Sequence, residues 1–270
     1  MSEYKPHRHP SWNYGGKRFR LSRSKIDLFS ICPRCFYIDN KLGTARPRGP
    51  AFTLNIAVDE LLKKEFDFYR AEGSPHPLMK EYGINAVPFK HQDMDKWRDS
   101  LRRGVEYFHE PTDFNISGGI DDVWVNPDTN ELYVVDYKAT AKNNKMNELS
   151  DTKWENQYKR QMDIYQWLLR KNGLQVSDTG YFVYANGDKS AESFDSKLEF
   201  DMTIIPYEGD DSWVEGSLMN IKKTLDSEEI PKASEDCEYC AYRNAAIKVI
   251  SEKTKKKNEP KGTKEKDTLF

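Results

Sequence analysis

Two runs of β-branched and aromatic residues flank a cluster of turn-forming residues between positions 117 and 138. The first run ends in Asp-Asp-Val-Trp-Val, the second reads Glu-Leu-Tyr-Val-Val-Asp-Tyr-Lys, and Asn-Pro-Asp-Thr-Asn separates them. This pattern predicts an antiparallel hairpin. Side chains alternate between the two faces of a strand, so Asp136 and Lys138 continue the apolar face of Leu132 and Val134. A carboxylate and an ammonium at the end of an apolar face are unusual for residues that only pack.

The charges of this hairpin predict a cation site. Asp121 and Asp122 lie on opposite faces of the first strand, and pairing brings one of them towards Asp136 and Lys138. Two half-buried carboxylates repel each other, and a divalent cation with oxygen ligands relieves the repulsion. A lysine beside such an ion can orient water and stabilise the charge that develops during phosphoryl transfer. The hairpin therefore indicates metal-dependent phosphodiester hydrolysis, and the alternative is an edge hairpin with solvated charges.

The segment Gly-Gly-Ile-Asp121, followed by Val-Val-Asp136-Tyr137-Lys138, resembles the core of the PD-(D/E)XK nucleases, in particular the RecB-type branch. The resemblance implies an α/β fold of the restriction-endonuclease type, in which helices flank a mixed central sheet. It also implies that Asp121, Asp136 and the backbone carbonyl of Tyr137 bind Mg²⁺ or Mn²⁺, and that Lys138 is catalytic.

A helix predicted from about 154 to 170 carries a second element of this branch. Gln161 and Tyr165 are one turn apart and share a face of the helix. They match the Gln-x-x-x-Tyr element that RecB-type nucleases carry after Asp-x-Lys, which implies that both belong to the catalytic site and orient the DNA strand. The sequence Leu-Ser-Arg-Ser, before a short helix that ends at Pro33, is similar to an N-terminal element of the same branch.

The four cysteines form two Cys-x-x-Cys pairs, Cys32 with Cys35 and Cys237 with Cys240. Four thiolates satisfy a tetrahedral metal site, although either pair alone also suits a redox dithiol or buried small side chains. In iron–sulfur members of the resembled branch, which include CRISPR-adaptation and AddB-type exonucleases, one N-terminal and three C-terminal cysteines hold a cluster. Here the arrangement is two plus two, with Ala246 where a third C-terminal cysteine is expected. A [4Fe–4S] cluster and Zn²⁺ are therefore both open at this site.

A helix predicted from about 52 to 70 by the spacing of its apolar residues could add ligands to the hairpin site. Family members often have a histidine on this helix that joins the metal. Asn55 takes the closest position here, and Asp59 follows one turn later on the same face. The resemblance makes both residues candidate ligands, and the alternative is a helix that only packs on the core.

With 270 residues and a formal net charge of -2, the chain suits one large domain, and any nucleic-acid site has to be a local basic patch. We expect a basic N-terminal arm at 1–20, a nuclease domain at 21–250 and a Lys-rich disordered tail at 251–270. Within the domain we expect a helical insert at about 52–110, including a helix from Met94 to Phe108. The cysteines should join the N- and C-terminal helical parts. The remaining predicted elements are strands at 180–184 and 198–207 and a helix at 213–225.

These features predict a metal-dependent DNA nuclease, exonuclease-like on single-stranded DNA or DNA ends, in DNA repair, recombination, CRISPR or phage processing. The chain has no helicase motif, so the expected partners besides DNA are a helicase or a CRISPR-adaptation protein. No apolar run reaches transmembrane length and the start lacks a signal-peptide core, so we expect a cytoplasmic protein without membrane contact. The alternative is a catalytically inactive DNA-binding or scaffolding relative, stapled by the four-cysteine metal site.

Overall fold

The predicted hairpin organises the larger of two β-sheets. The computed structural model describes residues 7–47, 49, 52–143 and 146–258. Strands β5 (Asp122–Val125) and β6 (Leu132–Thr140) pair antiparallel, with Asp122 opposite Val135. Between them the side chain of Asn126 accepts hydrogen bonds from two backbone N–H groups of the turn, which closes it. The hairpin prediction is confirmed.

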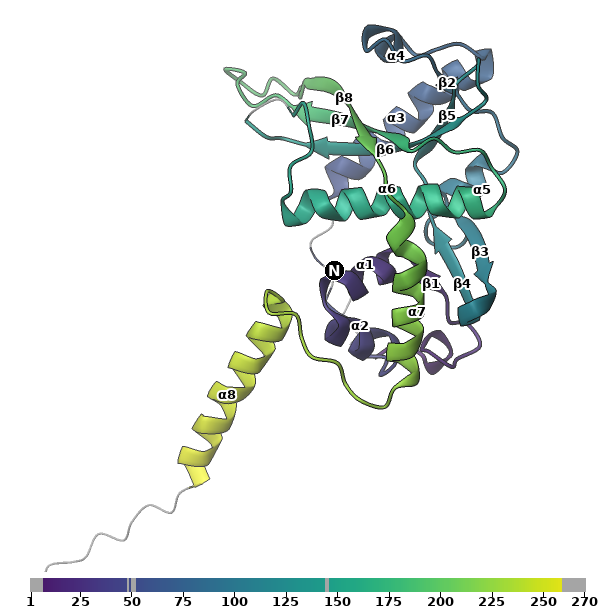
Figure 1. The fold of residues 1–270 in the computed structure, drawn as a ribbon. Coiled ribbons are helices and arrows are strands. Elements are labelled where there is room, and N and C mark those ends of the chain that lie inside the picture. The colour runs from purple at the N-terminus through teal and green to yellow at the C-terminus, as the bar shows by residue number, and fades with distance from the viewer. Residues whose placement is uncertain (1–6, 48, 50–51, 144–145, 259–270) are drawn as a thin grey trace, which may run out of the picture.

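The larger sheet is mixed, with the strand order β2-β5-β6-β7-β8. β6 and β7 (Thr179–Gly187) are parallel because α6 (Lys153–Lys171) carries the chain back between them. β2 (Val87–Pro88) and β8 (Phe200–Glu208) pair antiparallel at the two edges. Helix α6 lies on one face of the sheet and α3 (Thr53–Glu72) on the other, as Figure 1 shows.

Each face of this sheet has its own apolar core, as the alternation along β6 requires. Val134 belongs to the larger core together with Ile164 of α6. Its neighbour Val135 points the other way, into a core that contains Phe66 of α3 and Trp124, whose rings stack with centroids 5.5 Å apart. The central strands are thus buried on both faces, and polar groups of the hairpin can reach solvent only at the strand ends.

A smaller sheet directly precedes the hairpin in the chain. Its strands are β1 (Leu21–Ser22), β4 (Phe114–Gly118) and β3 (Val105–His109), in the order β1-β4-β3. The strand predicted to run unbroken into the hairpin is therefore two strands, β4 and β5, which belong to different sheets. Asp121 lies in the bend between them.

Two glycines make this bend. A Cβ atom on Gly118 would lie 2.7 Å from the ring of Tyr165, and one on Gly119 would lie 2.3 Å from the Cβ of Ser100. Such distances exclude any side chain unless the surroundings move, so only glycine allows the backbone to pass this closely. The Gly-Gly pair thereby lets Asp121 approach β6.

The prediction of a helix from Met94 to Phe108 is wrong. Helix α5 (Met94–Arg98) has five residues, and Gly104 adopts a left-handed φ of +89° before β3 begins. A left-handed residue ends helical geometry, and the residues that follow pair antiparallel with β4 instead. The expected helical insert is therefore a mixture of helices and short strands.

The helices near the chain ends pack together below the larger sheet in Figure 1. They are α1 (Arg23–Ile31), α2 (Pro33–Asn40) and α7 (Ser212–Asp226). The last helix, α8 (Glu238–Asn258), points away from the body (Figure 1). Residues 251–258, expected to begin a disordered tail, therefore continue a helix, whereas 259–270 lie outside the described residues. The remaining short elements are α4 (Pro77–Glu81) and the 3₁₀ turns η1 (Pro10–Trp12) and η2 (Glu110–Thr112).

Residues 7–20 pack on the body and do not form the separate arm that was expected. The rings of Tyr14 and Phe19 make edge contacts with Phe114, with centroids 6.2 and 5.9 Å away. The Tyr14 hydroxyl donates a hydrogen bond to Asp226 at 2.6 Å. Aromatic rings bury a large apolar area, which outweighs the basic character of the segment.

No helix in the described part of the chain combines the length and the apolarity that a membrane span needs.

Candidate active site

Strand β6 places Asp136 and Lys138 on the α6 side of the sheet. Asp136 is fully buried, and its carboxylate forms an ion pair with the Lys138 ammonium. The same ammonium lies 4.5 Å from the ring centroid of Tyr158 on α6. Because 15% of the Lys138 side chain is exposed, the buried pair has an outlet to solvent at this point.

Asp121 reaches the same pair from the bend between β4 and β5. Its Oδ2 atom accepts a hydrogen bond from the backbone N–H of Tyr137 at 3.2 Å. Its negative charge also acts on the carboxyl group of Asp136, and 24% of its side chain is exposed. The structure therefore brings Asp121, Asp136 and Lys138 together, as the hairpin pattern predicted, and it selects Asp121 over Asp122.

The surroundings of Asp136 disfavour its charged form. Burial raises the pKa of this carboxyl group to about 7, Lys138 opposes the rise, and Asp121 adds to it. A second positive charge beside Lys138 would therefore stabilise the two adjacent acids as carboxylates.

Helix α6 adds Gln161 and Tyr165 to the cluster. The Gln161 amide nitrogen donates to Asp136 Oδ1 at 2.6 Å and to the Tyr165 hydroxyl at 3.2 Å. The Gln161 amide oxygen accepts a long hydrogen bond from the Lys138 ammonium at 3.5 Å. Tyr165 is buried, and burial raises the pKa of its hydroxyl group. One amide thus holds both Asp136 and Lys138 in place.

Arg23 also belongs to this cluster, although it was not among the predicted site residues. It is the first residue of α1, its guanidinium contacts the Tyr165 hydroxyl, and it attracts Asp136 electrostatically. Burial alone would lower the pKa of Arg23, but Tyr165 and Asp27 outweigh burial and raise it. Its place within Leu-Ser-Arg-Ser, the segment similar to a RecB-type element, is the signal that pointed towards it.

This arrangement has a counterpart in a known family. A family model described as the PD-(D/E)XK nuclease superfamily matches residues 20–245 and so includes every residue of the cluster. The chain belongs to the PD-(D/E)XK nuclease superfamily. The match confirms the superfamily that the hairpin motifs suggested, and the RecB-type branch stays a prediction. No curated protein matches the chain significantly.

PD-(D/E)XK nucleases usually use divalent metal ions, and the clustered acids fit such an ion. Asp136 Oδ2 is buried and forms the ion pair with Lys138. It accepts no other hydrogen bond from the described residues. The carboxylates of Asp121 and Asp136 and the backbone carbonyl of Tyr137 are hard oxygen donors, which Mg²⁺ and Mn²⁺ prefer. The donor set therefore suits a divalent cation.

The helix position at which PD-(D/E)XK nucleases of the resembled branch often have histidine is used differently here. The amide of Asn55 donates to the carbonyl of Ala139 at 2.7 Å, and among the described residues it forms no hydrogen bond with the acids. Asp59 is linked to them by Lys63, whose ammonium lies 2.7 Å from Asp59 Oδ2 and 3.0 Å from Asp121 Oδ1. Burial, followed by the charge of Asp121, raises the pKa of Asp59. A lysine, not predicted from the sequence, thus closes the α3 side of the site.

Replacing Lys63 with methionine is expected to tighten Mn²⁺ binding at the acids by about 10-fold, because the ammonium competes with a cation for Asp121. Lys64→Met is the matched control, since Lys64 is the next residue, carries the same charge and is exposed. Its loss should change the Kd by less than roughly threefold, because solvent and salt screen an exposed charge. Calorimetric titration measures both values, and equal changes would contradict the competition.

Asp122 serves the fold on the opposite face of the sheet. It is fully buried, forms ion pairs with Arg70 and with Arg98, and accepts a hydrogen bond from the Tyr137 hydroxyl at 2.6 Å. Arg70 belongs to α3 and Arg98 to α5, so Asp122 ties both helices to β5. The two neighbouring aspartates of the hairpin therefore have separate tasks.

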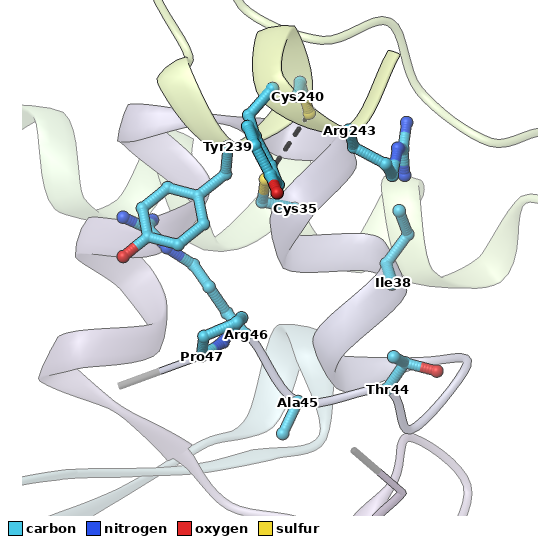
Figure 2. Close-up of a pocket in the computed structure, with 10 residues that line it drawn as sticks. Cys35, Ile38, Thr44, Ala45, Arg46, Pro47, Tyr239, Cys240 and Arg243 are labelled. Atoms are coloured by element: carbon cyan, nitrogen blue, oxygen red, sulfur yellow. Dashed lines mark hydrogen bonds between the residues drawn. The ribbon is translucent and has the colours of Figure 1, made fainter. Parts of the chain in front are cut away.

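The four cysteines meet away from these acids, where α2 approaches the start of α8. Cys32, Cys237 and Cys240 are buried, Cys35 is half-buried, and none of them forms a disulfide. All four sulfur atoms lie within 4.8 Å of one another, and Figure 2 shows Cys35 and Cys240 facing each other beside a pocket. The prediction that the two pairs share one site is confirmed, and this site could hold a metal.

Proposed function

We propose that the protein is a metal-dependent deoxyribonuclease that hydrolyses phosphodiester bonds in single-stranded DNA or at DNA ends. The convergence of Asp121, Asp136 and Lys138 at an outlet to solvent carries the proposal. Membership of a nuclease superfamily supports the chemistry. The Gln161 and Tyr165 element, which resembles the RecB-type branch, supports exonuclease-like action and a helicase or CRISPR-adaptation protein as partner.

Each residue of the acid cluster has a separate role in the proposed reaction. Asp121, Asp136 and the backbone carbonyl of Tyr137 would hold the Mg²⁺ or Mn²⁺ ion. When bound, the ion supplies Lewis-acid polarisation of a phosphate oxygen and lowers the pKa of water. Lys138 orients the attacking water and stabilises the negative charge that develops on the phosphate oxygens. Gln161 fixes the positions of Asp136 and Lys138.

Positive side chains around the cluster suit the DNA backbone despite the overall charge of -2. Arg23 and Lys63 flank the acids on opposite sides, from α1 and α3. Lys142 follows β6, pairs with Glu155 at 2.9 Å and leaves 49% of its side chain exposed. A local group of cations of this kind binds phosphates without giving the whole protein a basic character.

A cleavage assay on end-labelled DNA tests the proposed function. Linear single-stranded, linear double-stranded and closed circular substrates are each incubated with Mg²⁺, with Mn²⁺ or with EDTA. We expect shortening of linear DNA from an end with either metal, no cleavage of closed circles and no activity in EDTA. Cleavage that persists in EDTA, or no cleavage of any substrate, would contradict the proposal.

A second candidate function is that of a catalytically inactive relative that binds DNA or acts as a scaffold. Asn55 favours this alternative, because it bonds to a backbone carbonyl and does not join the acids. Such a protein would shift labelled DNA in a binding assay and leave it intact under every metal condition above.

Replacing Gln161 with alanine is expected to slow cleavage by about 10- to 100-fold, because the amide that orients Asp136 and Lys138 is lost. The turnover rate should fall while the affinity for DNA stays within about threefold of the wild-type value.

Gln166→Ala provides the matched control for this variant. Gln166 is buried on the same helix, and its amide donates to two backbone carbonyls just before β7. Its loss should lower the melting temperature and leave the cleavage rate per folded molecule unchanged. Equal rate losses in the two variants would count against a positioning role for Gln161.

A further inference from the structure

The sulfur atoms of the four cysteines are spaced like the ligands of one ion. The Sγ atom of Cys35 lies 3.5 Å from that of Cys240 and 3.6 Å from that of Cys237. The Sγ atom of Cys32 lies 3.9 Å from that of Cys240, and no pair is separated by more than 4.8 Å. Four sulfurs at about 2.3 Å from a zinc ion form a tetrahedron whose edges are about 3.8 Å long. The distances of 3.5, 3.6 and 3.9 Å are close to this edge length.

A four-iron cluster places a different demand on the same residues. Each thiolate binds its own iron, so the four cysteine sulfurs stand outside a core of irons and sulfides. They are then further apart than four sulfurs that share a single ion. The sulfur atoms of this chain, all within 4.8 Å of one another, are spaced closely enough to share one ion.

The two cysteine pairs also occupy equivalent positions, each at the start of a helix, as two pairs that bind one ion would. Cys32 directly precedes α2 and Cys237 directly precedes α8, so each pair spans the first turn of a helix. Helix N-termini stabilise thiolates, because their free N–H groups and the helix dipole favour negative charge. The backbone N–H groups of Cys35 and Ser234 lie near the Cys32 sulfur. N–H groups that point at a sulfur orient it as a metal ligand.

We propose that the four cysteines bind a single zinc ion, and that this ion fastens α8 and the segment before it to α2. The proposal concerns a structural site and does not depend on the proposed nuclease function. It departs from the one-plus-three iron–sulfur arrangement of the resembled branch, in agreement with the two-plus-two arrangement of the cysteines.

The ion has this fastening role because few other buried groups hold the end of the chain. Up to Pro231 the segment is anchored to α2, since Arg34 donates to the carbonyl of Pro231 at 2.9 Å. Beyond it, the cysteines form a small apolar cluster that is separate from both large cores. Figure 2 shows Arg46 beside the ring of Tyr239, whose centroid is 3.8 Å from the guanidinium carbon, at the surface of this cluster. The rest of α8 extends away from the body (Figure 1).

Metal analysis of the wild-type protein, purified without oxygen and without added metal, tests the identity of the ion. We expect one zinc per chain, no acid-labile sulfide and no visible absorption. Replacing the zinc with Co²⁺ should produce the intense visible bands of tetrahedral cobalt thiolate. Iron with acid-labile sulfide, a single iron without sulfide, or no metal at all would each overturn the proposal.

Hydrogen exchange tests the fastening role. Removing the ion with a strong chelator, or replacing Cys35 with serine, should speed amide exchange in residues 232–254 by at least about 10-fold while β6 and α6 stay protected. Ser234→Ala is the control, because it keeps the backbone N–H that contacts Cys32 and should retain both the zinc and the slow exchange. Unchanged exchange after verified loss of the ion would overturn the role of the ion as a fastener.

Discussion

Replacing Lys138 with methionine is expected to reduce DNA cleavage by about 10²- to 10³-fold, which is the usual loss when one group that stabilises a developing charge is removed. The ammonium of Lys138 lies against Asp136 at the solvent outlet of the cluster, where a phosphate would enter. Methionine keeps most of the length and the apolar body of the side chain, and it removes the charge together with the cation–π contact to Tyr158. DNA affinity, measured by fluorescence anisotropy in Ca²⁺, should change by less than about fivefold, because the other cations near the cluster would still attract the DNA backbone.

Lys171→Met is the control for this experiment. Lys171 ends α6, pairs with Glu215 and carries the same charge. Its loss should leave the rate of cleavage within about twofold of the wild-type rate. Parallel losses of cleavage and DNA binding in Lys138→Met would show that Lys138 binds DNA and takes no part in the chemical step.

Replacing Asp122 with asparagine should lower the free energy of unfolding by about 3–5 kcal/mol, the typical cost of breaking a buried ion pair. The substitution keeps the shape of the side chain, but it removes the fully buried negative charge that pairs with Arg70 and Arg98. Two guanidinium groups are then left in a largely dry environment. Urea unfolding measures the loss.

Asp67→Asn is the matched control, because Asp67 pairs with the same two arginines and 44% of its side chain is exposed. Solvent screens such a pair, so the expected loss is at most about 1 kcal/mol. A loss for Asp122→Asn no larger than that for Asp67→Asn would contradict the structural role of Asp122.

The parts of this site that lie on regular elements could be predicted from the sequence. Asp136 and Lys138 follow from the alternation of one strand, and Gln161 and Tyr165 follow from the period of one helix. These patterns are local, so the residues that carry them also decide which face each side chain takes. The structure then brings the two elements into contact, with Gln161 between Asp136 and Lys138.

Alternation along the strand places Asp121 and Asp122 on opposite faces, but it does not show which of them lies on the face of Asp136. That choice depends on the bend at Gly118 and Gly119, which arises from close approach to Tyr165 and Ser100. Those contacts join residues far apart in the chain, and composition does not reveal them.

The same reason explains why Arg23 and Lys63 were not predicted. The segment around Arg23 carried a family signal but gave the residue no role, and Lys63 is an ordinary helix residue in the sequence. Each becomes part of the site because α1 packs against α6 and β4, and α3 packs against β6. Asp59 and Lys63 are four residues apart on α3 and form an ion pair along the helix. Tertiary packing turned this pair into a contact with Asp121.

Titration of Mn²⁺ into the protein by calorimetry, with the cysteine site left in its native state, tests most directly whether Asp121 and Asp136 share one cation. Asp121→Asn and Asp136→Asn are compared with wild type and with Asp128→Asn, which removes an exposed acid from the turn of the same hairpin. We predict binding to the wild type and to Asp128→Asn, and no detectable binding to either of the other two variants. Mn²⁺ binding of wild-type strength in Asp121→Asn or in Asp136→Asn would contradict a shared site.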